Sequence, residues 1–257
     1  MTRVITVIGG KGGIGKTTLT SNLATALSQL GNDVIAVDAN LTTPNLGLHL
    51  GMHLAPNTLH DFLKGESKLN NAMYPHELGF KVIPGSMSIE DVQGVDVGKL
   101  PEVTLSLLGK SDFVIFDSAA GLGREALSAI AAADEILVIT NPDLPSVTDA
   151  LKTVKIAESL NKKILGVVVN KVRKKGYELT REEVSEMIDY PVLVEIPEDK
   201  NVAKSIAAKQ PVVNFEPDSP AAIEIRKLAG FLCGKSVEQR IKPKFGIIER
   251  LVRWMSG

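Results

Sequence analysis

Cysteine is almost absent from this chain, with Cys233 its single representative among 257 residues. One cysteine can form neither an internal disulfide nor a cysteine-only metal site within one chain. The sequence therefore excludes a disulfide-stapled extracellular fold, and we expect the chain to work in a reducing cytoplasm. Cys233 itself is expected to be a small, buried apolar residue in a helix.

Long apolar runs are also missing. The first one, Val4 to Ile8, is too short for the core of a signal peptide, and no stretch approaches the roughly 18 residues that a membrane-spanning helix needs. Aromatic residues make up only 4% of the chain, whereas hydrophobic residues in total make up 44%. The composition predicts a soluble globular protein with a core of Val, Ile, Leu and Ala.

A strong excess of one charge is lacking too, because the formal net charge is -1. This balance argues against a protein that coats nucleic acid through its overall field. The charge is nevertheless uneven: residues 235–257 carry six Lys or Arg against two Glu, a surplus of +4, and the preceding 234 residues carry -5. A basic tail on an acidic body indicates a separate role for the tail.

Short β-branched runs recur along the chain, and helical patterns lie between most of them. The runs are nearly continuous in apolar character, which is typical of strands buried on both faces. Alternating strands and helices predict a doubly wound, mainly parallel α/β sheet with helices on both faces, and residues 41–79 are expected to add short helices and loops beside it. The runs begin at Val4, Asp33, Phe80, Asp112, Glu135, Lys163 and Val192, and the helical patterns cover 17–30, 146–160, 180–188 and 220–232.

A glycine-rich loop follows the first predicted strand and opens the first predicted helix. Its pattern, Gly10-x-x-x-x-Gly15-Lys16-Thr17, is that of a phosphate-binding loop, in which backbone N–H groups and the helix dipole face the phosphates. Lys16 would reach the β- and γ-phosphates, and the Thr17 hydroxyl would coordinate Mg²⁺. The predicted loop residues are Gly10, Lys11, Gly12, Gly13, Ile14, Gly15, Lys16, Thr17 and Thr18.

Two aspartates stand at the carboxyl ends of predicted strands. Asp117 is placed to hold Mg²⁺ through water, and Asp38 to meet the metal shell or the attacking water. A purely structural role is the alternative for both carboxylates. After Asp117, Gly121 and Gly123 supply the flexibility that a loop sensing the γ-phosphate requires.

Base recognition has weaker signals. Asn170 closes another predicted strand, and its amide could pair with a donor and an acceptor on adenine. Pro197, Glu198 and Asp199 follow the next strand, where backbone groups could frame the base. Each of these signals could equally mark an ordinary turn.

The segment KGGIGKTT resembles the deviant Walker A signature of the MinD and ParA class of P-loop ATPases, which includes the nitrogenase iron protein. The resemblance spans nearly the whole chain and narrows to MinD-like proteins. It implies a P-loop fold that binds ATP or ADP with Mg²⁺. Further matches are DANLTTPNLGLHLG from Asp38, DSAAGLGREAL from Asp117, TNPDLPSVTDALK from Thr140 and IPEDKNVAKSIAAKQPV from Ile196.

The resemblance also assigns a role to Lys11, which in this family crosses an ATP-held homodimer to the phosphates of the other subunit. Two facing sites that each carry about four phosphate charges repel, and a cation reaching across turns that repulsion into attraction. An idle, exposed lysine is the alternative. The family commonly has an acid at the position of Asn40, and an amide can orient water but cannot accept its proton. Hydrolysis is therefore expected to be slow, partner-dependent or supported by Asp38.

The end of the chain, residues 245–257, is amphipathic at helical spacing. Together with a basic linker at 235–244 it would follow a P-loop domain formed by residues 1–234. A packed or partner-docking helix shows the same stripe, but the basic linker, two arginines and a tryptophan favour a membrane surface, and MinD proteins end in a comparable membrane-targeting helix. The apolar face comprises Phe245, Ile247, Ile248, Leu251, Val252, Trp254 and Met255.

The sequence thus favours an ATP-operated switch that binds the inner face of the cell membrane reversibly, recruits division or localisation machinery, and responds to a protein activator. The alternative is a ParA-like ATPase for DNA segregation, for which the run 171–175 is the candidate basic patch, although a solvated loop also accounts for it. Two further alternatives have less support. An iron–sulfur carrier of the Mrp type needs paired cysteines, and a ligase that phosphorylates a carboxylate needs a second substrate site.

Overall fold

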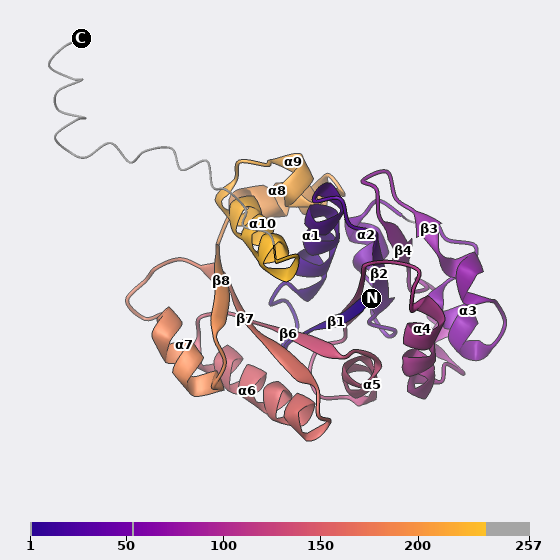
Figure 1. The fold of residues 1–257 in the computed structure, drawn as a ribbon, viewed down its shortest axis with the longest axis horizontal. Helices are drawn as coiled ribbons and strands as arrows, with labels where there is room; N and C mark the ends of the chain where they lie inside the picture. Colours follow the sequence, from indigo (N-terminus) through magenta and orange to yellow (C-terminus); the bar gives the residue numbers. More distant parts are fainter. Residues whose placement is uncertain (1, 53, 235–257) are drawn as a thin grey trace, which may run out of the picture.

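The computed structural model describes residues 2–52 and 54–234, which form an eight-stranded sheet with helices on both faces (Figure 1). The strand order is β3-β4-β2-β5-β1-β6-β7-β8, and all neighbours are parallel except β3 and β4. The predicted doubly wound α/β sheet is confirmed. The strands are β1 (Arg3–Ile8), β2 (Val34–Ala39), β3 (Tyr74–Pro75), β4 (Lys81–Ile83), β5 (Phe113–Ser118), β6 (Glu135–Thr140), β7 (Lys163–Val172) and β8 (Val192–Pro197).

All seven predicted strands are present, and the four predicted helices end within two residues of their expected bounds. The expectation for residues 41–79 is also met, except that this segment contributes the short strand β3. The helices are α1 (Lys16–Gln29), α2 (Leu46–His49), α3 (Leu59–Lys64), α4 (Leu100–Leu107), α5 (Arg124–Ala132), α6 (Leu144–Ser159), α7 (Arg181–Ile188), α8 (Lys200–Ala207), α9 (Val212–Phe215) and α10 (Pro220–Leu232), with 3₁₀ turns η1 (Leu69–Ala72), η2 (Glu90–Val92) and η3 (Val97–Lys99).

The sheet separates two apolar cores. Helices α1, α2, α9 and α10 bury their apolar side chains on one face, and α3 to α7 cover the other (Figure 1). Successive residues of a central strand enter opposite cores, as Val4 and Ile5 of β1 do. Since both faces are covered, the strands need apolar side chains in both directions, which explains their continuous apolar runs.

The direction of the crossovers reverses at β1. From β1 the chain crosses to β2 on one side, whereas β6, β7 and β8 follow on the other side. In open parallel sheets, the loops at the carboxyl ends of the strands separate at such a point and leave a crevice. The functional site is therefore expected beside the loop that follows β1.

The opposite, amino-terminal edge of the sheet is tied by charge. Glu135 of β6 lies 2.7 Å from Arg3 of β1 and 2.8 Å from Lys163 of β7. Burial tends to raise the pKa of Glu135, but the hydrogen bonds from Lys163 and Arg3 outweigh it and the pKa is lowered. These ion pairs link three strands at the edge away from the crevice.

The described part of the chain ends just after Cys233, at residue 234. Cys233 caps α10 and is half-buried, with Asn32 Nδ2 donating to its Sγ at 3.3 Å, so it does not lie buried within the helix as expected. The linker at 235–244 and the amphipathic segment at 245–257 lie outside the described residues and remain predictions. Within the described ranges, no helix has the length and apolar character needed to cross a membrane.

Candidate functional site

The glycine-rich loop of residues 9–15 runs from β1 to the start of α1, as predicted. Close neighbours leave no room for a side chain at Gly10 and Gly15 of this loop. A Cβ on Gly10 would lie 2.4 Å from Cβ of Asp149 on α6, and one on Gly15 would lie 2.4 Å from Nδ2 of Asn170. Gly15 also has a φ of 104°, a left-handed conformation that favours glycine. The loop is therefore held tightly between α6 and β7.

Side chains from outside the loop fix its carbonyl groups. Asn170 Nδ2 donates to the carbonyl of Ile14 at 2.7 Å, and Lys171 Nζ donates to the carbonyl of Gly13 at 2.7 Å. Within the loop, Lys16 Nζ donates to the carbonyl of Lys11 at 3.2 Å. This contact of Lys171 was not predicted, because the residue belongs to the basic run 171–175, for which a DNA-binding patch and a solvated loop were the two interpretations. The proposed pairing of the Asn170 amide with adenine stays a prediction.

A cleft of about 840 Å³ opens beside this loop. Loops after β2, β5, β7 and β8 complete it, so the site lies at the carboxyl edge of the sheet, as the topology indicates. The structure thus brings together most of the residues predicted for the nucleotide site, although they are far apart in the sequence. Those that line the cleft are Gly12, Gly13, Gly15, Lys16, Thr17, Thr18, Asn40, Asn170, Pro197, Glu198 and Asp199.

The other residues predicted for the nucleotide site do not line the cleft. Gly10 packs on α6, Ile14 is buried in the core, and Gly121 belongs to the loop before α5. Asp38 and Asp117 are fully buried. Lys11 points along the surface, with Nζ 4.0 Å from Asp143 Oδ1 and 41% of its side chain exposed.

One side of the cleft is an apolar wall, which was not predicted from the sequence. The wall is formed by α1, β8, α8 and α10, and two of its members, Val202 and Ile206, are four residues apart on α8. That spacing shows an apolar helix face, but it does not tell a ligand-binding face from one packed in the core. The wall residues are Leu19, Ile196, Val202, Ala203, Ile206 and Ile225.

Lys16 and Asp117 form the charged floor of the site. Lys16 is buried, and burial lowers its pKa although the Asp117 carboxylate opposes that change. Burial raises the pKa of Asp117 to about 6, against the effects of the nearby Thr17 hydroxyl and Lys16 ammonium. Neither carboxylate oxygen of Asp117 has a well-formed hydrogen bond within the described part of the chain. A buried carboxylate without a partner beside a threonine hydroxyl suits a hydrated divalent cation.

Asp38 fixes the start of the next loop. Its carboxylate accepts hydrogen bonds from the backbone N–H groups of Leu46 at 2.9 Å and Asn40 at 3.3 Å. Burial, and then the charge of Asp117, raise its pKa well above the usual value despite these bonds. Asp38 therefore holds the backbone at the start and the end of residues 40–45. Its contact with the metal shell stays a prediction.

Residues 40–45, between β2 and α2, form a closed loop at the mouth of the cleft. Asn40 Nδ2 donates to the carbonyl of Thr43 at 2.6 Å, and Thr43 Oγ1 donates to Asn40 Oδ1 at 3.2 Å. From α5, Glu125 accepts the N–H groups of Leu41 and Thr42 at 3.1 and 3.3 Å, as well as the Thr42 hydroxyl. Glu125 lies in the matched segment DSAAGLGREAL, but that match assigned it no role and did not predict this contact.

The acids that follow β8 are also engaged. Glu198 pairs with Arg173 through two contacts of 2.7 and 2.8 Å, and Asp199 caps α8 by accepting the N–H of Asn201 at 2.8 Å. Arg173 belongs to the basic run 171–175, so two of its cations, Lys171 and Arg173, are bound to the site's own loops. Both residues remain exposed, as the interpretation of a solvated run expects, but their side chains are engaged in these contacts.

Comparisons with known proteins agree with this geometry. The model of the CobQ/CobB/MinD/ParA nucleotide binding domain matches residues 5–212. Two uncharacterized ATP-binding proteins of Methanocaldococcus jannaschii are similar along their whole length. One is 36% identical over 97% of this chain and 97% of its own, and the other is 38% identical over 100% and 98%.

Solved structures show the same fold. The septum site-determining protein MinD of Pyrococcus horikoshii, complexed with Mg-ADP, has a TM-score of 0.88 and 38% identity, covering 90% of this chain and 96% of its own. The cell division ATPase MinD of Pyrococcus furiosus has a TM-score of 0.89 and 37% identity, with coverage of 91% and 99%. MinD in the MinC:MinD complex of Aquifex aeolicus has a TM-score of 0.82 and 28% identity, with coverage of 93% and 98%.

The family model spans most of the chain, and several solved MinD structures share its fold. The chain therefore belongs to the MinD/ParA family of P-loop ATPases, as a MinD-like member.

Proposed function

We propose that this chain binds ATP and ADP with Mg²⁺ in the cleft beside the phosphate loop and hydrolyses ATP to operate a dimerisation and membrane-association switch. The observation that carries the proposal is the floor of the cleft, where buried Lys16 lies beside the unpartnered carboxylate of Asp117 at the carboxyl edge of the sheet. The similar MinD of Pyrococcus horikoshii, complexed with Mg-ADP, supports the same ligand here.

Different residues of the cleft would bind the phosphates, the base and the metal ion. Lys16 and the backbone of residues 10–17 would hold the phosphates, and the apolar wall around Ile196 and Ile206 would take the base. The Thr17 hydroxyl and the Asp117 carboxylate would hold the magnesium ion, partly through water. When bound, the ion neutralises phosphate charge and favours attack at the γ-phosphate. Asp38 and Asn40 would orient water at the mouth of the cleft.

Dimerisation would depend on Lys11. Its ion pair with Asp143 is long, at 4.0 Å, and both side chains are about half exposed, so the pair contributes little energy and leaves the ammonium group free to move. A lysine of this kind can reach phosphates that a facing copy binds. An ATP-held homodimer would then place two tails on the same side, and their joint binding makes membrane residence depend on the nucleotide.

Membrane association and partner binding extend the proposal beyond the described residues. The predicted amphipathic face of 245–257, after its basic linker, is suited to an anionic lipid surface. A protein effector or activator is supported by the MinC:MinD complex of Aquifex aeolicus. We place the chain in the cytoplasm, reversibly bound to the inner face of the cell membrane, in the positioning of division sites or of other proteins.

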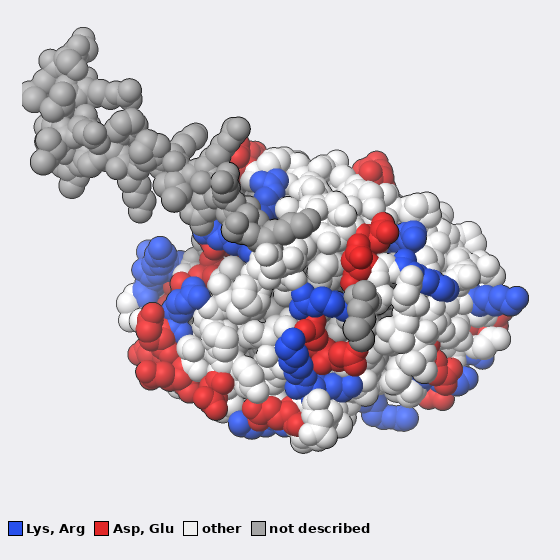
Figure 2. All heavy atoms as spheres, in the orientation of Figure 1, with Lys and Arg blue, Asp and Glu red and all other residues white. Residues whose placement is uncertain are grey.

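Two contacts reduce the support for the DNA-segregation alternative. In the run 171–175, Lys171 donates to the phosphate loop and Arg173 pairs with Glu198. Among the described residues in Figure 2, basic and acidic side chains are interspersed over the face shown. Binding to the DNA backbone uses clustered lysine and arginine side chains, so these features favour the membrane switch.

The test is co-sedimentation of the full chain with anionic liposomes in the presence of ATP or ADP. We expect binding to be at least about tenfold stronger with ATP, and to be lost when 245–257 are removed. Ile248→Asp on the predicted apolar face should abolish binding, whereas its control Ser256→Asp, which adds the same charge to the polar face, should weaken it far less. Lipid binding that ignores both the nucleotide and the tail would overturn the switch.

A further inference from the structure

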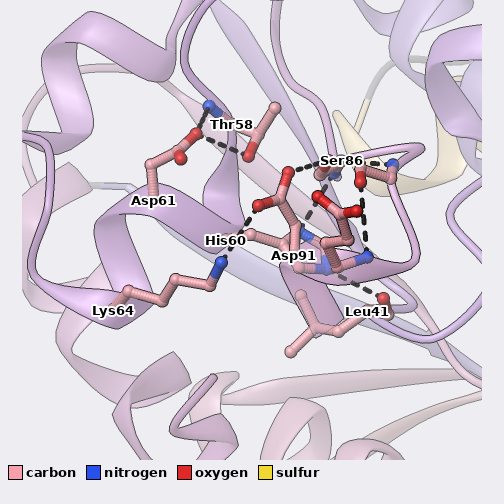
Figure 3. Close-up of polar contacts among 9 residues, drawn as sticks. Leu41, Thr58, His60, Asp61, Lys64, Ser86 and Asp91 are labelled. Atoms are coloured by element: carbon pink, nitrogen blue, oxygen red, sulfur yellow. Dashed lines mark hydrogen bonds and ion pairs between the residues drawn. The ribbon is translucent and has the colours of Figure 1, made fainter. Parts of the chain in front are cut away.

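His60 of α3 is fully buried, and both of its ring nitrogens are engaged (Figure 3). Nε2 lies 2.8 Å from the carbonyl oxygen of Leu41, and Nδ1 lies 3.0 Å from the backbone nitrogen of Ser86. A backbone N–H can only donate, so Nδ1 is the acceptor and Nε2 carries the proton that is donated to Leu41. Burial lowers the pKa of His60, which keeps the ring neutral at physiological pH. The ring therefore bridges two loops, donating a hydrogen bond to one and accepting a hydrogen bond from the other.

One end of this bridge is the loop at the mouth of the cleft. The backbone of Leu41 is held on both sides, because its N–H donates to Glu125 and its carbonyl accepts from His60. Other members of the same loop, Asn40, Thr43 and Asn45, line the cleft. The position of the Leu41 backbone therefore affects what the loop presents to a ligand.

The other end is anchored to the body of the protein. Ser86 Oγ donates to Asp91 Oδ2 at 2.5 Å, and Lys64 Nζ contacts Asp91 Oδ1 at 3.0 Å (Figure 3). Lys64 belongs to the same helix as His60, so the segment 86–91 and α3 brace each other. The Nδ1 end of His60 therefore contacts a segment, 86–91, that is itself held to α3 by hydrogen bonds and an ion pair. We call this segment together with α3 the support.

Packing confirms that the cleft loop and this support fit closely. A Cβ on Gly85 would lie 2.6 Å from Cβ of Pro44 and 3.4 Å from Cε1 of His60. Pro44 belongs to the cleft loop, so a side chain at position 85 would push that loop away from the histidine. The contact is independent of the two hydrogen bonds.

We propose that His60 is a positioning residue for ATP hydrolysis, which holds the carbonyl of Leu41 and thereby keeps residues 40–45 in the conformation that faces the cleft. The inference rests on the proposed function, because it assigns a support to the same nucleotide site. A buried carbonyl that loses its donor must find another partner, and a loop that shifts by a fraction of an ångström misaligns the groups it carries. His60 touches neither nucleotide nor metal in this arrangement and acts through Leu41.

Two substitutions separate the two ends of the bridge. His60→Asn can keep an acceptor near the position of Nδ1 but loses the donor to Leu41, whereas His60→Gln can keep a donor near the position of Nε2. His76 provides the matched control, because its Nε2 lies 3.1 Å from the carbonyl of Leu50 and its Nδ1 accepts the N–H of Leu78 at 3.2 Å. His76→Asn breaks the same kind of bridge away from residues 40–45.

The full-length variants are compared by kcat and KM for ATP with Mg²⁺, by the Kd for Mg-ADP, by thermal unfolding without nucleotide, and by hydrogen exchange of the amides in 40–46. We expect His60→Asn to lower kcat by about tenfold or more, to leave the Kd for Mg-ADP within about threefold, and to speed exchange in 40–46. His60→Gln should lie between it and the wild type. His76→Asn should lower the unfolding temperature and leave kcat unchanged.

The proposal would be overturned if His60→Asn folded and kept both the wild-type kcat and the wild-type rate of hydrogen exchange in 40–46. In that case its only defect would be a lower unfolding temperature, as expected for His76→Asn. Should the His60 variants not fold, Gly85→Ala decides, because it displaces Pro44 with the histidine intact: a lower kcat supports the positioning role and an unchanged kcat overturns it. Failure of the proposed function is distinguishable, since the wild type itself would then neither bind nor hydrolyse ATP.

Discussion

Asp38 and Asp117 lie opposite each other in the register of the neighbouring strands β2 and β5, and both are fully buried. Two adjacent carboxylates in a dry interior resist being ionised together unless a cation is close. Burial raises the pKa of Asp117 to about 6, and burial together with the charge of Asp117 raises the pKa of Asp38 well above its usual value. Without ligand, the pair therefore holds protons more tightly than the unfolded chain does.

This pair predicts how stability changes with pH in the nucleotide-free protein. The pKa of Asp117 is higher in the folded state than the ordinary value of 3.8, so its stabilisation is complete below that value and is lost as pH rises through about 6. We expect this group to lower the free energy of unfolding by roughly 2 kcal/mol between about pH 4 and about pH 8. Urea unfolding across this range measures the change.

Asp117→Asn isolates the contribution. The variant should show a flatter pH profile and should lose the rise in unfolding temperature that Mg²⁺ adds to ADP binding. Asp112→Asn is the matched control, because Asp112 precedes the other end of β5 and accepts the N–H of Asp33 at an exposed position. A wild-type pH profile in Asp117→Asn would contradict the prediction.

Gly15→Ala should destabilise the protein even without nucleotide. The new Cβ would lie 2.4 Å from Nδ2 of Asn170, and the backbone has a φ of 104°. Strain at such a φ and the displaced Asn170 should together cost about 1 to 3 kcal/mol of unfolding free energy. Gly12→Ala is the control within the same loop, because a Cβ there meets no atom of the described residues within 4 Å. Equal losses in both variants, measured by urea unfolding, would refute the crowding argument.

Local patterns predicted the strands, the long helices and the phosphate loop because each depends on residues adjacent in the sequence. β3 was missed since its two residues, Tyr74 and Pro75, make no apolar run. The contacts of Lys171 with Gly13 and of Glu125 with Leu41 join residues far apart in the chain, and no property of either residue alone specifies its partner. The phosphate loop was therefore predictable, whereas the side chains that hold it and its neighbouring loop were not.

Asn40 tests whether its position acts in proton transfer or in loop support. Asn40→Asp cannot donate to the carbonyl of Thr43 and places a negative charge beside Asp38. We expect the ATPase kcat to fall by about tenfold, with a smaller change in the Kd for Mg-ADP. The matched control is Asn71→Asp, because the side-chain amide of the exposed Asn71 has one recorded hydrogen bond, to Ser67 Oγ at 3.4 Å. If kcat of Asn40→Asp rose above the wild-type value, position 40 would be a site of base chemistry instead.

Lys11→Ala tests the predicted link between nucleotide and dimer. Within the described residues, the contact recorded for the Lys11 side chain is its long ion pair with Asp143, and 41% of that side chain is exposed, so its removal should change the free energy of unfolding by less than about 0.5 kcal/mol. In a dimer, the same ammonium would lie between two sets of phosphates, where the repulsion is strong and a cation has its largest effect. We therefore expect Lys11→Ala to fold normally as a single chain and to lose only the ability to dimerise.

Light scattering of the purified chain with a non-hydrolysable ATP analogue and Mg²⁺ measures this. We expect a dimer for the wild type and a monomer for Lys11→Ala, with nucleotide affinity of the variant within about threefold of the wild type. Lys152→Ala is the control, because Lys152 is an exposed lysine of α6 paired with Asp149 at 3.1 Å, and its loss should leave the dimer intact. A wild type that remains monomeric, or a Lys11→Ala variant that dimerises equally well, would show that the cation at position 11 does not join the two subunits.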